Sequence, residues 1–453
     1  MVCQQHRFPL DDFDALRVHW RLCPDGPGFL ESPAPNPRLG RYSIVPLRRR
    51  ESFRLDGQGL VCLNTDGETP VPGEPFAALE QILEQRRCRP RLQDCPFPGG
   101  FFGFFSYDLA GRIEDLPRRA QRDRPVPDLW LDWVDLTAVY DHQQRLVTLS
   151  SLDAGDDLLG WEQEIRGALR CPLPEAPGSA PPPMAIVPPE QFRAMVERAQ
   201  AYIAAGHIYQ ANLSVRFDTA ATLSSTELYR RLRHINPSPF GGLLRSPGLD
   251  LISASPERLF SLRGRTAETR PIAGTRPRGY HAAEDRALGE ELLGHPKERA
   301  EHIMLLDLER NDLGKVCRTG SVEVDEFMVL ERYSHVTHIV SNVRGELRDG
   351  IGPFALLRAM FPGGTITGVP KKRCMEIIDE LEPVGRGTYT GSAGYLSVTG
   401  EVDLNILIRT FQRFADGLTY QTGAGIVADS EPEREWQECL AKGQALRQAL
   451  EGP

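Results

Sequence analysis

The chain has 453 residues and a formal net charge of −9, with 25% charged and 40% hydrophobic residues. These values are ordinary for a globular protein long enough to bury a large core in one to three domains. The acidic balance and the lack of a long Lys/Arg run argue against a nucleic-acid partner. No apolar stretch is long enough to cross a bilayer, and Asp11, Asp12 and Asp14 interrupt any signal sequence, so no membrane association is expected.

Nine cysteines are scattered along the chain, and no two of them form a C-x-x-C pair. An odd number without metal-binding spacing indicates reduced thiols rather than a disulfide framework. The sequence therefore predicts a cytoplasmic protein.

Residues 1–171 form the first predicted region, in which short strand-like runs alternate with turns rich in Gly, Pro and Asp. Strands are predicted at 41–46 and 59–63, two more strands within 128–149, and a helix over 158–169. The segment GGFFGFFSYDL at 99–109 is dense in aromatic residues. A buried core strand is favoured there over a ligand surface, with glycines that let neighbouring backbone approach closely.

A composition break follows at 172–189, where eight of eighteen residues are proline and few are large and apolar. Such a segment predicts an extended, poorly packed connector. It divides the N-terminal region from a larger C-terminal region at 190–453.

The C-terminal region alternates predicted helices and strands. Helices are predicted at 189–205 and 296–312, and strands at 207–217, 249–262, 321–343, 391–398, 404–414 and 418–424. The strands follow one another like an antiparallel meander interrupted by long helices. This order predicts an α+β fold rather than a doubly wound parallel sheet.

Two predicted helix starts stand beside candidate functional residues. In FPGGTITGVPKKRCMEIIDELE (361–382) a glycine-rich loop precedes a helix whose first residue is predicted to be Pro370. Free N–H groups at such a place suit a carboxylate or phosphate, although most such loops are only turns. The last helix is predicted to begin with a capping box formed by Ser430 and Glu433.

Acidic residues share a face on two of the predicted helices. Glu298 and Glu301 are three positions apart, and Glu435, Glu438 and Lys442 fall on one face of the last helix. Such spacing is usual for a solvated surface. The alternative is a site for a hard divalent ion such as Mg²⁺, which takes one or two protein carboxylates and leaves its other positions to water and an anionic substrate.

A set of motifs carries a family resemblance from about residue 190 to the end of the sequence. The motifs, in order, are RPIAGTRPRG (270–279), HPKERAEHIMLLDLERNDLG (295–314), RYSHVTHIVSNV (332–343), GGTITGVPK (363–371), TGSAGYL (390–396), LNILIRT (404–410) and GAGIVADSEPE (423–433). Together they resemble the chorismate-utilising enzymes, among them anthranilate synthase component I, aminodeoxychorismate synthase component I, isochorismate synthase and salicylate synthase. FLESPAPNPRLGRYSIV (29–45) and the 99–109 segment resemble the N-terminal region of the first two.

The resemblance implies a fold and a cofactor. The expected fold is an α/β sandwich of two large, packed, mainly antiparallel sheets flanked by helices, with the proline-rich segment as a surface excursion. The resemblance also implies Mg²⁺ ligation by Glu301 and Glu438, with Glu298 and Glu435 orienting metal-bound water.

Further residues are implied to bind chorismate. Arg409 and Tyr395 match positions that hold the pyruvyl carboxylate, and a guanidinium suits that role because its fork meets both carboxylate oxygens. The backbone N–H groups of an anion cradle would come from Thr365 and its loop and from Gly423, Ala424 and Gly425.

The resemblance places Glu257 as the general acid that protonates the departing C4 hydroxyl. His338 lies at the position beside that hydroxyl, although a lone His on a strand is more often structural. Thr275 would line the approach of the nucleophile.

The nucleophile is expected to be ammonia. Family members that add water carry a lysine base where this chain has Gln210, and ammonia needs no such activation. The sequence has no cysteine in a Gly-x-Cys-x-Gly turn, so a separate glutamine amidotransferase subunit is implied.

Two products remain open. Asn212, the TITG loop and the Gly391-Ser392 pair resemble the enzymes that aminate C4 and give 4-amino-4-deoxychorismate for p-aminobenzoate and folate synthesis. Ala273 does not, because many of those enzymes carry a nucleophilic lysine there. The PIAGT, FLES and GRYS segments resemble the anthranilate synthases, which aminate C2 for tryptophan synthesis. C4 amination is the favoured hypothesis.

A third possibility is a catalytically inactive family member that acts as a regulatory subunit. The family's key positions argue against it, because all of them are intact: Glu257, Glu301, His338, Arg409 and Glu438.

Overall fold

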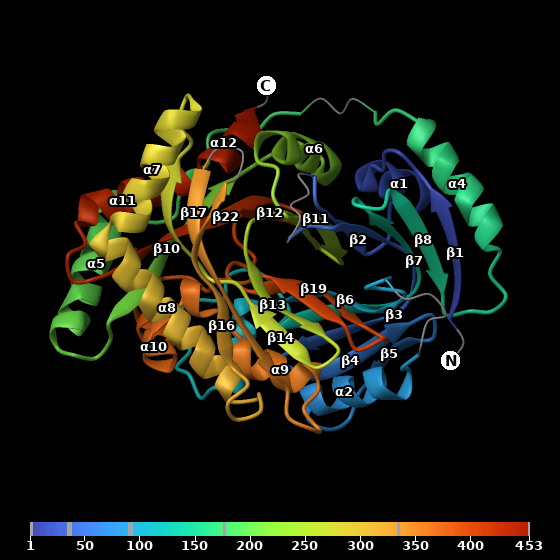
Figure 1. Ribbon diagram of the computed structural model, residues 1–453, viewed down its shortest axis with the longest axis horizontal. Helices are drawn as coiled ribbons and strands as arrows, with labels where there is room; N and C mark the ends of the chain where they lie inside the picture. Colours follow the sequence, from blue (N-terminus) through green and yellow to red (C-terminus); the bar gives the residue numbers. More distant parts are fainter. Residues whose placement is uncertain (1–2, 34–38, 89–93, 175–177, 333–335, 452–453) are drawn as a thin grey trace.

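The computed structural model describes residues 3–33, 39–88, 94–174, 178–332 and 336–451. Its named strands pair antiparallel in two long runs, which lie across from each other in Figure 1. The first run contains β9 (Met184–Ala185) and β18 (Gly368–Val369) beside β10 (Gln210–Thr219), then β22 (Gly417–Ile426), β21 (Thr410–Phe414), β12 (Leu249–Ser255), β11 (Phe240–Ser246) and β2 (Gly28–Glu31).

The second run begins with β16 (Glu323–Arg332) and β17 (Val336–Glu346), which also pairs with β15 (Ile272–Pro277) and β14 (Thr266–Thr269). It continues through β13 (Arg258–Arg263), β20 (Val402–Asn405), β19 (Ser392–Ser397), β6 (Gly100–Phe105) and β7 (Leu129–Asp141). Strands β8 (Leu146–Ser151) and β1 (Gln4–Pro9) extend β7, and β4 (Gly59–Asn64) and β5 (Gly67–Pro70) extend β3 (Tyr42–Asp56). Strand β3 pairs with both β2 and β7, so it joins the two runs.

The strand β6 shows why the two runs pack together. Its aromatic side chains alternate between two cores, as the pleat of a strand requires. Phe102 and Phe104 enter a core shared with β11, β12 and β21, whereas Phe101 and Phe105 enter a core beneath helices. A Cβ on Gly103 would lie 2.0 Å from the Trp130 carbonyl oxygen, so only glycine allows β7 to approach this closely. The predicted buried strand and the predicted antiparallel sandwich are confirmed.

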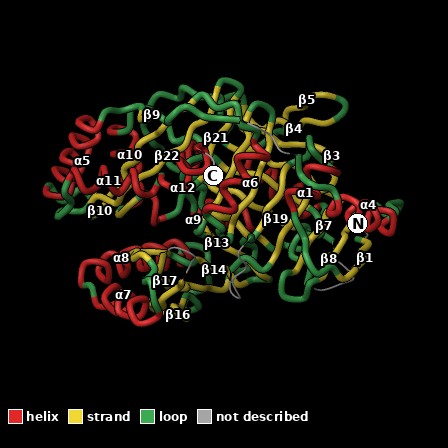
Figure 2. The backbone as a smooth tube through the Cα atoms, turned by 90° about the horizontal axis from the view of Figure 1, so that it is seen from above, coloured by secondary structure: helices red, strands yellow, loops and turns green. Residues whose placement is uncertain are grey.

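Helices cover the outer faces of both runs. Those packed on the first run are α5 (Pro189–Ala204), α6 (Ser225–Ile235), α11 (Pro432–Lys442) and α12 (Gln444–Glu451). Helix α1 (Ala15–Leu22) packs on β2 and β3, and α4 (Leu158–Arg170) packs on β1 and β8 of the second run. Those packed on the second run are α2 (Pro75–Gln85), α3 (Ala110–Ile113), α8 (Pro296–Gly314) and α9 (Pro353–Met360). Helix α10 (Lys371–Leu381) packs on β10, and α7 (Ala282–Gly294) lies with α8, β16 and β17 at one side of the molecule (Figure 2).

The proline-rich segment 172–189 is partly paired. Residues 175–177 lie outside the described residues, but β9 pairs with β10 and the Thr219 hydroxyl donates a 2.7 Å hydrogen bond to the Pro181 carbonyl. Hydrogen-bonded pairs also join the two sequence regions, since β2 pairs with β11 and β6 with β19. The region boundary stays a prediction about sequence organisation.

Two helix starts differ from the sequence predictions. Pro370 is the N-cap of α10, not its first residue, because its ψ of 140° is extended where the preceding β18 pairs with β10. The N-cap of α11 is Glu431, and no side chain caps it. The predicted capping box does not form, since the Ser430 hydroxyl instead accepts from the Val427 N–H at 3.1 Å.

The cysteines and the apolar character of the helices were also addressed by the sequence. All nine cysteines are free thiols. Within the described residues, no helix combines the length and apolar character needed to span a membrane.

Candidate active site

Glu257 lies in the sharp turn between β12 and β13. The turn is fixed to residue 406, whose N–H donates to the Glu257 carbonyl at 3.0 Å and whose carbonyl accepts from the Ser255 hydroxyl at 2.6 Å. The Glu257 side chain is buried, and burial raises the pKa of its carboxyl to about 8. The charge of Glu309 raises this pKa further, while the nearby Thr365 hydroxyl lowers it. At neutral pH the carboxyl is protonated.

Four buried oxygen atoms lack a hydrogen-bond partner among the described residues: Glu257 Oε1 and Thr365 Oγ1 at this turn, and Gln210 Oε1 and Asn212 Oδ1 on β10 beside the glycines of β22. Thr365 is close enough to Glu257 to affect its pKa, yet these two oxygens do not meet in hydrogen-bond geometry. Leaving buried polar atoms unpaired costs about 1–3 kcal/mol each. The unpaired oxygens of Glu257 and Thr365 are therefore suited to hydrogen bonds with a polar ligand.

The glycines of β22 line the same region. A Cβ on Gly423 would lie 2.7 Å from Asn212 Oδ1 and 2.9 Å from the Tyr389 hydroxyl. A Cβ on Gly425 would lie 2.5 Å from the Gln210 side-chain nitrogen. Bare backbone is therefore required for β22 to pass beside these side chains. Ala424, between the two glycines, is buried in the core beneath the helices of the first run.

Arg409 carries the positive charge of the site. Its guanidinium donates a 2.6 Å hydrogen bond to the Lys442 carbonyl, and no carboxylate pairs with it in the part of the chain that the structure describes. Burial lowers the pKa of Arg409, an effect that Tyr389 opposes. A partly buried guanidinium without a counter-charge is suited to an anionic ligand.

The structure does not bring Tyr395 to this group. Its ring lies 5.0 Å from that of Phe97, in the core between the two strand runs. Tyr389, six positions earlier, is beside Arg409 and Gly423 instead. Both tyrosines flank the same TGSAG motif. The alternation of side chains along β19 could have distinguished them, because it directs Tyr395 into the core together with the Phe-rich strand β6.

His338 and Thr275 meet across the β15–β17 pair. The distance from Thr275 Oγ1 to His338 Nδ1 is 3.0 Å, and that nitrogen is 3.3 Å from the Gly274 carbonyl oxygen. Although His338 keeps some exposed surface, burial lowers its pKa to about 4, and the charges of Arg409 and Lys442 act in the same direction. The ring is neutral at pH 7. Ala273 is half-buried on β15, opposite residue 339 and just before the bulge at Gly274.

The four glutamates of α8 and α11 are near one another. Burial raises the pKa of Glu301 to about 6, and the charges of Glu298, Glu438 and Glu435 raise it further, while Lys297 opposes them. Glu298 is 3.1 Å from Arg276.

The donor chemistry of these glutamates can be compared with the needs of Mg²⁺. Glu438 is 2.6 Å from Lys442. Among described residues, no three His, Cys, Asp or Glu side chains are already arranged as a metal cage. Mg²⁺ does not require one, because one or two carboxylates suffice beside water and substrate oxygens. The oxygen-only donor set fits this ion.

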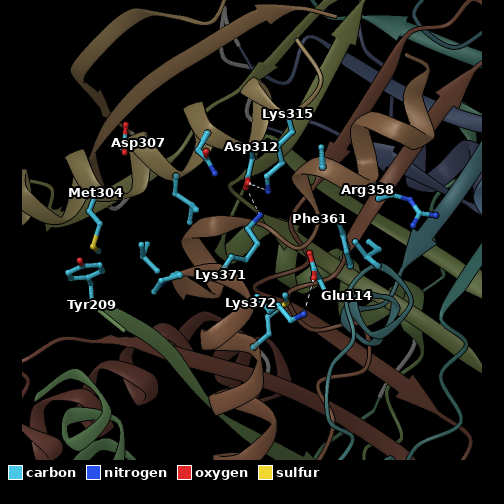
Figure 3. A pocket seen from close by; sticks show the side chains of 17 residues that line it. Glu114, Tyr209, Met304, Asp307, Asp312, Lys315, Arg358, Phe361, Lys371 and Lys372 are labelled. Atoms are coloured by element: carbon cyan, nitrogen blue, oxygen red, sulfur yellow. Dashed lines mark hydrogen bonds and ion pairs between the residues drawn. The ribbon is translucent and has the colours of Figure 1, made fainter. Parts of the chain in front are cut away.

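A surface groove lies elsewhere, between α8, α9 and α10 (Figure 3). It has a volume of about 550 Å³ and contains the Lys371–Asp312 ion pair, with Tyr209 beside Met304 at one end. None of the predicted catalytic, substrate-binding or metal-binding residues lines it. The buried acid Glu257 and the guanidinium of Arg409 therefore lie outside this groove.

Comparison with known proteins agrees with this geometry. A family model described as chorismate binding enzyme matches residues 53–448. The chain belongs to the chorismate-binding enzyme family. It is 46% identical to an "Anthranilate synthase component I-like protein" of Synechocystis sp., over 94% of this chain and 86% of the relative. It is 43% identical to "Aminodeoxychorismate synthase component 1" of Bacillus subtilis, over 91% and 90%.

A solved structure shows the same architecture. The crystal structure of anthranilate synthase component I from Streptococcus pneumoniae matches this chorismate-binding enzyme with a TM-score of 0.80 and 32% identity. The match covers 90% of this chain and 92% of that one. Relatives of the chain thus carry the names of two different chorismate-using activities.

Proposed function

We propose that the chain aminates chorismate with ammonia in a Mg²⁺-dependent reaction at the interior site. One observation carries the proposal: Glu257 is a buried carboxyl with a raised pKa, and it lies beside the Thr365 hydroxyl, which has no hydrogen-bond partner among the described residues. A hydroxyl leaves a carbon poorly unless it is protonated, and a carboxyl that stays neutral at pH 7 supplies that proton. Arg409 supplies the binding charge for a substrate that carries two carboxylates.

The residues have separate tasks in the step. Glu257 donates its proton to the C4 hydroxyl as the C–O bond breaks, so the leaving group is water. Ammonia forms the new C–N bond through its lone pair, and the resulting ammonium returns one proton to the Glu257 carboxylate. Neutral His338, held by Thr275, lies beside this position without adding a charge.

Glu301 and Glu438 would hold Mg²⁺, with Glu298 and Glu435 orienting its water. When bound there, the ion would neutralise the ring carboxylate of chorismate and help to withdraw electron density at C2 as the C4 hydroxyl leaves. In the free protein the Glu301 carboxyl is repelled by its three neighbours, a repulsion that a divalent cation relieves.

C4 amination is the product we favour. Asn212 and the TITG loop resemble the corresponding segments of the aminodeoxychorismate enzymes. The two are in contact beside Thr365, since the Asn212 N–H donates to the Thr367 carbonyl at 2.9 Å. A glutamine amidotransferase subunit would supply the ammonia. A second candidate, C2 amination to anthranilate, is favoured by Ala273, because a chain without an amine there cannot form a covalent adduct at C2.

Product identification tests the proposal. The purified chain is incubated with chorismate, Mg²⁺ and ammonium at alkaline pH, with Glu257→Gln as the inactive control, and products are resolved by chromatography and mass spectrometry. We expect 4-amino-4-deoxychorismate, which its lyase converts to p-aminobenzoate. Fluorescent anthranilate as the main product would establish the second candidate. Unconsumed chorismate would leave only the inactive, regulatory role.

Ala273→Lys refines the same experiment. A tethered amine has a high effective concentration at C2. The variant should keep or raise the yield of 4-amino-4-deoxychorismate. A fall in that yield with a rise in anthranilate would contradict C4 amination.

A further inference from the structure

Glu309 is a buried acidic residue of α8 that the sequence did not single out. It is only 3% exposed. Its Oε1 accepts a 3.1 Å hydrogen bond from the Gly364 N–H, and its Oε2 is 3.2 Å from the Thr269 hydroxyl. Both contacts reach segments that adjoin Glu257, since Gly364 precedes Thr365 and the Thr269 hydroxyl also contacts the Leu259 carbonyl.

The contact with Gly364 fixes the loop that faces the acid. A Cβ on Gly364 would lie 2.9 Å from Glu309 Oε1 and 2.5 Å from a methyl carbon of Leu308, so the loop is pressed against α8. The Thr367 hydroxyl donates to the Gly363 carbonyl at 2.9 Å and closes the same loop. The position of Thr365 opposite Glu257 therefore depends on the Glu309 carboxyl.

The Thr269 hydroxyl has two acceptors within reach. It is 2.9 Å from the Leu259 carbonyl and 3.2 Å from Glu309 Oε2, and its single proton can be donated to only one of them at a time. A hydrogen bond from Thr269, like that from the Gly364 N–H, favours the ionised carboxyl and lowers the pKa of Glu309, against the larger effect of burial.

Several charged groups face the two carboxyls. Glu309 faces the cation Lys371, which favours ionisation, and Asp312, which opposes it and is itself paired with Lys371 and Lys315. Glu257 faces Glu309 and Lys442. Burial raises the pKa of Glu309 to about 7, so this group loses its proton within the pH range in which the enzyme would work.

We propose that Glu309 is a positioning residue for the acid Glu257: it anchors the Gly363–Thr365 loop and, once ionised, its charge keeps the Glu257 carboxyl protonated at alkaline pH. The inference rests on the proposed function for its catalytic meaning. The coupling itself is a property of the free protein. Glu309 thereby extends the acid form of Glu257 into the pH range where more of the ammonia is unprotonated.

The test compares Glu309→Gln with Asp307→Asn, an exposed change on the same helix. Glutamine keeps an oxygen for the Gly364 N–H but carries no charge. The infrared carboxyl band that Glu257→Gln removes reports the protonation of Glu257 as pH rises. In Glu309→Gln this band should be lost about one pH unit lower than in the wild type, because a nearby like charge is gone. Asp307→Asn should titrate like the wild type.

A kinetic measurement connects the coupling to catalysis. At a fixed concentration of unprotonated ammonia, the alkaline limb of kcat/KM should move down by the same interval in Glu309→Gln, with the plateau retained. An unchanged infrared titration in a folded Glu309→Gln protein would overturn the proposal. A shifted band without any turnover of chorismate would instead reject the proposed function alone.

The wild-type protein offers a second measurement if Glu309→Gln does not fold. The carboxyl band that Glu257→Gln removes should still be present in the wild type at pH 7 and be lost only as pH rises toward 9. Loss of that band below pH 6 would overturn the proposal without a change at Glu309.

Discussion

The Arg409 guanidinium is held by the Lys442 carbonyl, at the last residue of α11, through a hydrogen bond of 2.6 Å. The final carbonyls of a helix have no partner within the helix, and they carry partial negative charge. The end of α11 can therefore orient the guanidinium without neutralising it, as a carboxylate would. The charge of Arg409 stays available for a substrate anion.

Arg409→Lys should raise the KM for chorismate and lower kcat/KM by about tenfold to hundredfold. Lysine keeps the charge but loses the planar fork that meets two carboxylate oxygens. Arg447→Lys is the matched control, since Arg447 also donates to an α11 carbonyl, that of Leu440, outside the site. Steady-state kinetics at saturating ammonium decide the matter. Equal kinetics for the two variants would remove Arg409 from substrate binding.

Tyr389→Phe should lower kcat/KM for chorismate by about tenfold, the value of one hydrogen bond to a charged group. Its hydroxyl would lie 2.9 Å from a Cβ on Gly423, and Tyr389 is near enough to Arg409 to affect the pKa of the guanidinium. Tyr395→Phe changes a ring packed on Phe97 and should leave the kinetics near those of the wild type. Comparing the two variants by the same kinetic assay shows which tyrosine serves the substrate, and the reverse pattern would restore the sequence-based choice of Tyr395.

Glu438→Gln should leave the fold intact, cripple turnover and raise the Mg²⁺ concentration needed for half-maximal rate. Removing one carboxylate from the four weakens the binding of a divalent ion. Glu433→Gln, on the same helix and paired with Arg193, is the control. Titration with Mn²⁺, followed by electron paramagnetic resonance, measures the affinity without turnover. Unaltered Mn²⁺ affinity in Glu438→Gln would assign these glutamates to a solvated surface.

Relative to the wild type, the Glu257→Gln variant should become increasingly stable as pH rises. The folded-state pKa of Glu257 is about 8 against 4.5 for an ordinary glutamate, so unfolding releases a proton between these values. The free energy of unfolding of the wild type therefore falls across this window, relative to the variant, by up to about 5 kcal/mol. Urea denaturation at pH 5 and pH 8 measures the difference.

Asp123 provides a control for that experiment, because folding shifts its pKa in the direction opposite to that of Glu257. Hydrogen bonds and charge from Arg216 lower the pKa of Asp123 and outweigh the opposite effect of burial. The Asp123 carboxylate therefore stabilises the folded state above pH 3.8. Asp123→Asn should therefore cost stability at pH 5 and pH 8 and lose this effect in acid. A constant difference between wild type and Glu257→Gln at both pH values would show that Glu257 is not held protonated.

Glutamine use provides another check. The purified chain should turn over chorismate with ammonium and not with glutamine, and glutamine should serve only after an amidotransferase subunit is added. The amide nitrogen of glutamine is not nucleophilic until hydrolysis releases it. Ammonia-dependent and glutamine-dependent rates, measured with and without the partner, make the comparison. Glutamine turnover by the chain alone would contradict a two-subunit enzyme.

The sequence predicted those features that depend on local pattern. The buried aromatic strand at 100–105, the α8 helix and the shared face of Glu298 and Glu301 follow from residue type and spacing, which the structure retains. Glu309 was missed because it lies among the apolar residues of α8, where spacing alone gives no sign of its partner Gly364. The contacts that define its role come from segments distant in sequence.

Helix starts were also poorly predicted, for a related reason. Whether Pro370 is inside or outside α10 depends on β18, which pairs with β10 in another part of the chain. Tertiary pairing, rather than the local preference of proline, set that boundary.

The pairing of β10 with β22 also has a consequence for the order in which the protein folds. It places Asn212 opposite Gly425, and Arg386 bonds to the Asn212 carbonyl across 174 positions of sequence. Contacts between such distant segments require large loops to close, which slows the formation of a native sheet. The acid turn and the glycine strand can come together only after most of the chain has been ordered. We therefore expect refolding protein to regain its helical circular dichroism well before it regains the capacity to bind chorismate.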